Sequence, residues 1–285
     1  RSEPRVSVLK PTDRAAGPTS PAPRMSPEKT PVYIILGSAG SGRRELLADL
    51  IADGLAPGDQ PAVLLSDAET PHSLDAKLPP GPRWTWQPGP PAAIELEKPP
   101  LTGPLFLVAD GRRNPVDQME AFKPWLENNH AAVARVICVV DCTLASHHPA
   151  LLAWYDACVH FSDVVLLNRR EGVENRWLSG FLEHFRTQHL PCLFETVKAG
   201  RVKNPALLLE PQARRLTQIF DEEQDWVVTD LEGGELEEGE ETEDEEVLAA
   251  PAEDPYLARR SGGRRVKEIP DLADFLDQPE KKNAG

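Results

Sequence analysis

The chain has 285 residues, a length that suits one α/β domain with appended segments. Its formal net charge is −15, but fifteen Asp and Glu and no Lys or Arg fall within 221–250, which leaves 31 acidic and 31 basic residues in the rest of the chain. The acidity therefore belongs to one solvated segment, so we expect no nucleic-acid partner. No apolar run approaches the ~20 residues that a membrane helix needs, so we expect no membrane span either.

The four cysteines lie in apolar segments and do not form the pattern of a disulfide framework. Unpaired cysteines are typical of reducing compartments. The N-terminal stretch lacks the apolar segment of a secretory signal. We therefore expect a cytoplasmic protein.

Composition divides the chain into four parts. Residues 1–30 are rich in Pro, Ser, Arg and Lys without periodic apolar positions, which predicts a disordered arm. Residues 31–220 carry the apolar runs and form the predicted folded domain. The acidic stretch 221–254 is expected to be a disordered linker, and 255–285 a basic, amphipathic tail segment.

The tail segment places a basic cluster ahead of a short apolar pattern. The basic residues are Arg259, Arg260, Arg264, Arg265 and Lys267, and the apolar positions are Ile269, Leu272, Phe275 and Leu276. Asp271 is placed to cap the first turn of a short helix. Such a segment predicts docking of a protein client through 255–278, and the alternative is a solvated tail without a partner.

Short apolar runs alternate with helical spacing through the middle of the chain. The runs that predict buried strands are 32–36, 62–65, 105–109, 136–140 and 164–168. The helical patterns are 44–55, 116–129, 151–161 and 176–188. This alternation predicts an α/β fold with a doubly wound, mostly parallel sheet of the P-loop NTPase type.

The connection between the second and third predicted strands, residues 66–104, is crowded with proline. A regular helix is not expected through most of it, and a long insertion without secondary structure is usually a functional loop or disordered. Trp84 and Trp86 are placed to pin it to the domain surface by packing on alternate sides.

The stretch "YIILGSAGSGRREL", residues 33–46, starts like a phosphate-binding loop, since it joins a predicted strand to a predicted helix. Its glycines allow a tight turn whose backbone N–H groups approach an anion at the helix N-terminus. The alternative is a glycine-rich turn without a ligand. The candidate phosphate-binding residues are Gly37, Ser38, Gly40, Ser41, Gly42, Arg43 and Arg44.

Two substitutions separate this loop from an active one. A nucleotide-binding loop has Lys where this chain has Arg43, and Ser or Thr where it has Arg44. Arg43 keeps the charge but differs in length and shape. Arg44 has no acceptor oxygen, so it cannot ligate Mg²⁺, and we expect impaired hydrolysis. The alternative places the two arginines as surface charges that open a helix.

A guanine-reading pattern follows the last predicted strand. Guanine-binding loops use Asn-Lys-x-Asp, and this chain has Asn168, Arg169 and Glu171 at the corresponding positions. The charges are kept while the reach of both side chains changes. The three residues are candidates for contacts with the base.

The order of these blocks resembles the CobW-like branch of P-loop GTPases, the family of metallochaperones and cobalamin-synthesis proteins, over about 31–200. The resemblance rests on the loop, on "AVLLSDAE", "LFLVADGRRNPVDQMEAF", "ARVICVVDCTLAS" and "DVVLLNRREGV". It implies a switch that binds GTP or GDP with Mg²⁺ and delivers a metal ion to a client. It also places Asp110 and Gly111 near the terminal phosphate, where Arg112 and Arg113 could complete an anion pocket with Arg43 and Arg44.

The departures from the family are specific. Its Cys-x-Cys-Cys metal motif falls within 79–101, which contains no Cys, so no metal ligand is carried over. Cys138 and Cys142 are expected to be core residues, and His147 and His148 to lie on the surface of an extended loop rather than to bind metal.

Three functions are compatible with the sequence. The first is binding of guanine nucleotide with weak or no hydrolysis. The second is a pseudo-GTPase that serves as an interaction scaffold through its tail. The third is an enzyme, an active GTPase with substituted catalytic groups.

Overall fold

A computed structural model describes residues 29–89, 91–97, 99, 102–221 and 253–276. Most of the predicted disordered arm and most of the acidic linker lie outside these residues, and Thr30, predicted to belong to the arm, begins a strand. The predicted boundaries of the four parts stay predictions.

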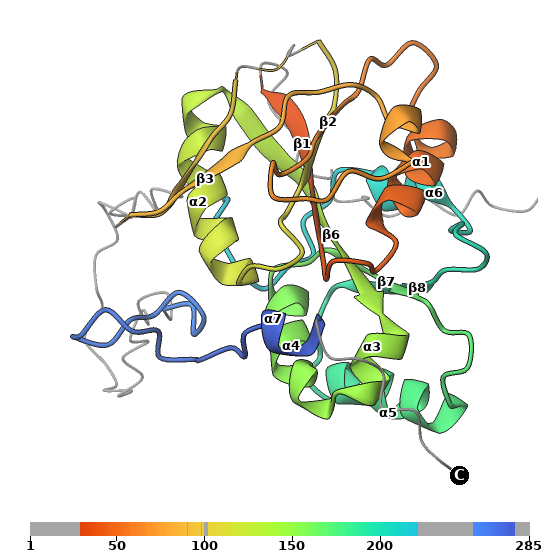
Figure 1. The fold of residues 1–285 in the computed structure, drawn as a ribbon, viewed down its shortest axis with the longest axis vertical. Coiled ribbons are helices and arrows are strands. Elements are labelled where there is room, and N and C mark those ends of the chain that lie inside the picture. The colour runs from red at the N-terminus through yellow and green to blue at the C-terminus, as the bar shows by residue number, and fades with distance from the viewer. Residues whose placement is uncertain (1–28, 90, 98, 100–101, 222–252, 277–285) are drawn as a thin grey trace, which may run out of the picture.

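The described residues form a six-stranded, wholly parallel sheet with the strand order β2-β5-β1-β6-β7-β8 (Figure 1). Its strands are β1 (Thr30–Gly37), β2 (Ala62–Leu64), β5 (Leu105–Val108), β6 (Ala131–Asp141), β7 (Val164–Asn168) and β8 (Leu193–Thr196). The predicted α/β fold with a parallel sheet is therefore confirmed. The structure also contains the short strand β8, which was not predicted because its sequence is only weakly apolar.

Helices cover both faces of this sheet, with α1 and α6 grouped on one side and α2 on the other (Figure 1). The helices are α1 (Arg43–Gly54), α2 (Pro115–Asn128), α3 (Cys142–His147), α4 (Leu152–His160), α5 (Asn175–Arg186), α6 (Pro205–Leu209) and α7 (Ala273–Leu276). Four of them match the predicted helical patterns. The expectation that His147 and His148 lie in an extended loop is wrong, because His147 is the last residue of α3 and His148 is its C-cap.

Successive side chains of β1 point to opposite faces of the sheet, so the hydrophobic core has two layers. Val32, Ile34 and Leu36 pack with α2 and α4 on one face. Ile35 lies on the opposite face with Leu46 and Leu47 of α1. Successive side chains of a strand point to opposite faces, and each face here is fully covered. Cys138 and Cys142 are free thiols buried in the first layer, as the sequence predicts.

The proline-rich connection is more regular than its composition indicates. It contains a two-stranded antiparallel hairpin of β3 (Thr85–Gln87) and β4 (Ala93–Glu95), which corrects the expectation of a loop without secondary structure. The predicted pinning by tryptophan is observed, because Trp84 is fully buried and its indole N–H donates to the Val108 carbonyl at 3.0 Å. Trp86 is partly buried against the same core, so the expectation that the two rings pack on alternate sides is wrong.

The tail segment packs against the domain itself. Tyr256 and Leu272 are buried, and the Arg265 guanidinium pairs with Asp117 and Glu120 of α2. The short helix α7 lies beside α3 and α4 (Figure 1). Asp271 accepts from the backbone N–H of Ala273 at 3.0 Å, so its predicted place at the helix start is confirmed.

A second contact near the start of the segment joins His160 of α4 to Asp254 at 2.9 Å. Burial alone would raise the pKa of Asp254, but hydrogen bonds from His160, Thr217 and the Tyr256 amide outweigh it and lower the pKa to about 2. Asp254, directly before the segment, and Arg265, within it, are therefore both held to the domain.

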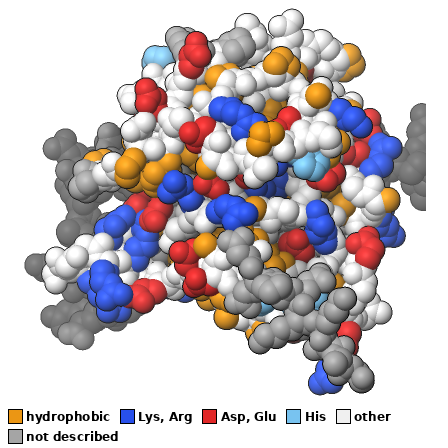
Figure 2. Space-filling model, in the orientation of Figure 1, with side chains coloured by type: hydrophobic (Ala, Val, Ile, Leu, Met, Phe, Trp, Pro, Cys, Tyr) orange, Lys and Arg blue, Asp and Glu red, His pale blue; other side chains and the backbone are white. Residues whose placement is uncertain are grey.

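Charge on the face shown in Figure 2 is interleaved, with basic and acidic side chains next to one another. This mixture agrees with the balanced composition outside the acidic stretch. Within the described part of the chain, none of the helices has the length and apolar character to cross a bilayer.

Replacing Arg265 by Gln should loosen the tail segment. Hydrogen bonds between charged groups are worth about 1.5–3 kcal/mol, so amide hydrogen exchange in 254–276 should become ~10-fold faster or more while the sheet is unaffected. The matched control is Arg264→Gln, since Arg264 is 78 % exposed. Equal exchange in the two variants would contradict this account of the docking.

Candidate functional site

The loop between β1 and α1 has the backbone that its glycines predict. Gly37, Gly40 and Gly42 have φ of 137°, 83° and 89°, which L side chains rarely adopt. A Cβ at Gly37 would come within 2.5 Å of the Val139 carbonyl oxygen, whereas a Cβ at Gly40 would meet nothing within 4 Å. The loop is therefore tight against the sheet and open toward solvent.

Gly42 is the N-cap of α1, and no side chain among the described residues caps the helix there. The N–H groups of the first helical turn have no partner within a helix, and the helix dipole makes that end electropositive. The first turn therefore supplies donors for an anion.

A pocket of about 340 Å³ opens at this end of α1. Of the residues predicted for the site, it is lined by Gly40, Gly42, Arg43, Arg44, Asp110 and Arg169. Because the sheet is parallel, the segments after β1, β2, β5 and β7 meet at the same edge and together enclose the pocket.

Arg43 does not extend freely into the pocket. Its side chain is only 4 % exposed, and its guanidinium donates to the carbonyl of Ala109 and to the carboxylate of Glu69. The alternative in which Arg43 is a surface charge is therefore wrong. Its charge is neutralised by an acidic residue of the chain itself.

Arg44 is held in the same way. It donates to Glu69 at 3.1 Å, to Asp75 at 2.5 Å and to the Thr70 carbonyl at 3.0 Å. The side chain is 15 % exposed. The position that carries a hydroxyl in an active loop thus has a guanidinium fixed between two carboxylates.

Glu69 connects these arginines to the segment after β5. Its carboxylate also accepts the backbone N–H of Gly111 at 3.2 Å, and its side chain is 8 % exposed. Burial alone would raise the pKa of Glu69, but the charge and hydrogen bond of Arg43, the Gly111 amide and the charge of Arg44 hold that pKa below its usual value. The carboxylate is therefore ionised and paired.

The segment after β5 is closed onto the loop. The Ala39 N–H donates to the Gly111 carbonyl at 2.8 Å, and a Cβ at Gly111 would lie 2.4 Å from the Ala39 nitrogen. The Asp110 carboxylate accepts the Arg112 amide at 2.9 Å and Arg113 at 3.1 Å. Asp110 thus shapes its own turn.

The predicted anion pocket of four arginines is only partly assembled. Arg112 lines the pocket with Arg43 and Arg44, but Arg113 instead lies over the ring of Trp86 at 5.0 Å. The expectation of four converging guanidinium groups is therefore wrong, because Arg113 contacts Trp86 of β3 and does not line the pocket.

At the end of β7, the Asn168 amide donates to the Ser41 carbonyl at 2.8 Å, although neither residue lines the pocket. Arg169 has a left-handed φ of 49° and lies 3.5 Å from the Asp141 carboxylate. Glu171 is exposed and is not among the residues that line the pocket. The structure thus brings two of the three candidate base contacts to the loop.

Ser38 and Ser41 are fully buried beneath the loop rather than directed into the pocket. The Ser41 hydroxyl lies 3.0 Å from the position of a Cβ on Gly37 and has no hydrogen-bond partner within the described part of the chain. Neither hydroxyl replaces the one that Arg44 removes.

These residues fit a phosphate group and do not fit the magnesium ion that usually accompanies it. The open position of Gly40 and the uncapped first turn of α1 suit phosphate oxygens. The guanidinium of Arg44 offers a cation no ligand, and its own charge opposes one. Across the residues that the structure describes, no group of three His, Cys, Asp or Glu is arranged to hold a metal ion.

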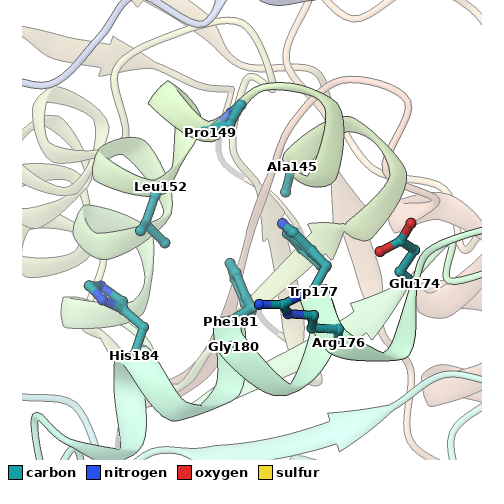
Figure 3. Close-up of a pocket in the computed structure, with 9 residues that line it drawn as sticks. All are labelled: Ala145, Pro149, Leu152, Glu174, Arg176, Trp177, Gly180, Phe181 and His184. Atoms are coloured by element: carbon teal, nitrogen blue, oxygen red, sulfur yellow. The ribbon is translucent and has the colours of Figure 1, made fainter.

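A second pocket, of about 490 Å³, lies between α3, α4 and α5 (Figure 3). Trp177 and Phe181 of α5 point into it opposite Leu152 of α4, with Glu174 and His184 at its rim. It is largely apolar and shares no residue with the loop pocket.

No family profile and no curated protein sequence matches this chain. Among solved structures, it is similar to a zinc-bound triple mutant of the YjiA GTPase, with a TM-score of 0.36 and 16% identity over 68% of this chain and 69% of that chain. It is also similar to the zinc-bound YjiA GTPase from E. coli, with a TM-score of 0.36 and 13% identity over 62% of each chain, less than two thirds of that protein.

Sequence reasoning missed Glu69, Asp75 and Leu276, all of which lie at or beside the loop pocket. Glu69 and Asp75 belong to the proline-rich connection, and the available signal was an unbalanced pair of arginines that required acidic partners. Leu276 of α7 lines the pocket because the tail segment folds back on the domain.

Replacing Asn168 by Ala should lower the free energy of unfolding by about 1 kcal/mol, because the Ser41 carbonyl loses its donor. Urea denaturation measures this change. The matched control is Asn175→Ala, at an exposed position that begins α5. An equal effect of both substitutions would show that Asn168 does not support the loop.

Proposed function

We propose that this chain binds a guanine nucleotide at the loop 37–44 and hydrolyses it slowly or not at all. The observation that carries the proposal is the uncapped N-terminus of α1, reached through a glycine-rich turn from a central strand and open to a pocket of about 340 Å³. Backbone donors in this arrangement bind phosphate without help from side chains.

The weak hydrolysis follows from the two arginines. Phosphoryl transfer depends on a cation that neutralises the charge developing on the transferred group. Arg44 stands where the cation's hydroxyl ligand would be and is tied to Glu69 and Asp75. Phosphate binding is retained in this account, and the Mg²⁺-dependent step is not.

The base end of the pocket is the part of the proposal that the sequence motif supports. Asn168 is fixed on the loop by its hydrogen bond to Ser41, and Arg169 lines the pocket. The free and buried cysteines support a reducing, cytoplasmic location.

The second candidate function is a pseudo-GTPase scaffold. It is favoured by the internal neutralisation of Arg43 and Arg44, which leaves both charges satisfied in the absence of a ligand. In this case a protein client would engage the tail segment, whose Arg265 is itself bound to α2.

Isothermal titration of the full chain with GDP, GTP and ADP, with and without Mg²⁺, tests the proposal. We expect guanine nucleotide to bind with an affinity that changes less than ~3-fold with Mg²⁺, and GTP turnover to be negligible. Gly42→Ala should weaken binding ~10-fold or more, because a Cβ there would lie 2.3 Å from the Asn168 side-chain nitrogen and φ is 89°.

The matched control is Gly58→Ala, since Gly58 also has a positive φ, of 102°, and lies in an exposed turn with nothing near its Cβ position. Both variants lose a similar conformational freedom, so only the site variant should lose nucleotide. Binding of no nucleotide by the wild-type chain would refute the first proposal and leave the scaffold. Rapid Mg²⁺-dependent GTP hydrolysis would refute both.

A further inference from the structure

The carboxylate of Glu69 gathers the donors that a terminal phosphate would use. In phosphate-binding loops the Lys position reaches the β- and γ-phosphates, and the next residue faces the phosphate-bound cation. Here those positions are Arg43 and Arg44, and both donate to Glu69. The backbone N–H of Gly111, expected near the γ-phosphate, donates to it as well.

We propose that Glu69 occupies the place of the terminal phosphate, so that the site accepts a nucleoside diphosphate and discriminates against the triphosphate. The inference rests on the proposed nucleotide binding and adds the ligand class. Glu69 is a specificity-determining residue in this account, because its carboxylate and a γ-phosphate would compete for the same three donors.

The diphosphate part of the site stays open. Gly40 and Gly42 line the pocket, and a Cβ at Gly40 would meet nothing within 4 Å. The first-turn amides of α1 are adjacent and lack a side-chain cap in the part of the chain that the structure describes. A β-phosphate can therefore reach the loop amides while Glu69 stays in place.

Glu69 is not free to leave. Its segment is tied to the residues directly before β3 by the Asp67 N–H, which donates to the Trp84 carbonyl at 2.9 Å, and by Arg83, which donates to the Ser66 carbonyl at 2.7 Å. Trp84 itself is fully buried. Movement of Glu69 would thus disturb a packed element as well as two ion pairs.

Entry of a triphosphate has two costs. The Glu69 carboxylate must give up its hydrogen bonds to charged partners, each of which stabilises the folded state. If it stays nearby, its negative charge repels the γ-phosphate in a largely buried site where screening by salt is weak. Both costs act on the triphosphate and spare the diphosphate.

Titration of the full-length chain with GDP and with guanosine 5′-(β,γ-imido)triphosphate tests the inference. Wild type should bind GDP ~10-fold or more tightly than the triphosphate. Glu69→Ala and Glu69→Gln should bring the two affinities within ~3-fold of each other, mainly by strengthening the triphosphate, since the competing charge is removed. Inorganic pyrophosphate and tripolyphosphate serve as base-free probes and should follow the same order.

Asp75→Asn is the matched control. It removes a carboxylate from Arg44 but leaves the contacts of Glu69 with Arg43 and Gly111, so the preference for GDP should persist. Glu69→Gln keeps the size of the side chain, and a thermal melt reports whether each variant is folded. The affinity ratio of the wild type alone decides the matter if the variants unfold.

The possible failures can be told apart. Equal affinity of wild type for the two nucleotides, or a ratio unchanged in folded Glu69 variants, would overturn the role of Glu69 while nucleotide binding stands. Absence of binding by GDP, the triphosphate analogue and pyrophosphate to every variant would overturn the proposed function and the inference together.

Discussion

The ion cluster around Glu69 is the interaction on which the site depends. One carboxylate receives Arg43 and Arg44 from the start of α1 and the Gly111 amide from the segment after β5. Two guanidinium groups placed at the electropositive end of a helix would repel each other and the helix dipole without an acidic partner. In this structure that partner is Glu69, which is supplied by the chain itself.

The fold could be predicted from the sequence where a segment is strongly apolar or periodic. Runs such as 136–140 and 164–168 gave the central strands, and their continuous apolar character predicted a parallel sheet. The hairpin after Trp84 could not be predicted, since its three-residue strands are stabilised by packing on α2 rather than by local propensity. The fold-back of the tail segment depends on Arg265 and a distant helix, which no local pattern reveals.

The candidate site was predictable as a loop and not as a charge arrangement. Glycine spacing predicted the turn, and the chemistry of Arg44 predicted the missing hydroxyl. The partner of both arginines lies in the proline-rich connection, 26 residues from Arg43, and reaches it through tertiary structure alone. This cluster changes the interpretation of the two arginines from free anion-binding groups to groups already engaged.

The most direct test of the account is an NMR titration of the Glu69 side-chain carboxyl carbon in the ligand-free protein. A carboxylate held by two guanidinium groups and a backbone amide should keep its charge to unusually low pH. The account predicts a pKa below the ordinary 4.5 for Glu69, and loss of the shift when Arg43 is replaced by Gln. A pKa at or above 4.5 in the wild-type chain would show that the carboxylate is not in the cluster, and would contradict its role as the internal substitute for a phosphate.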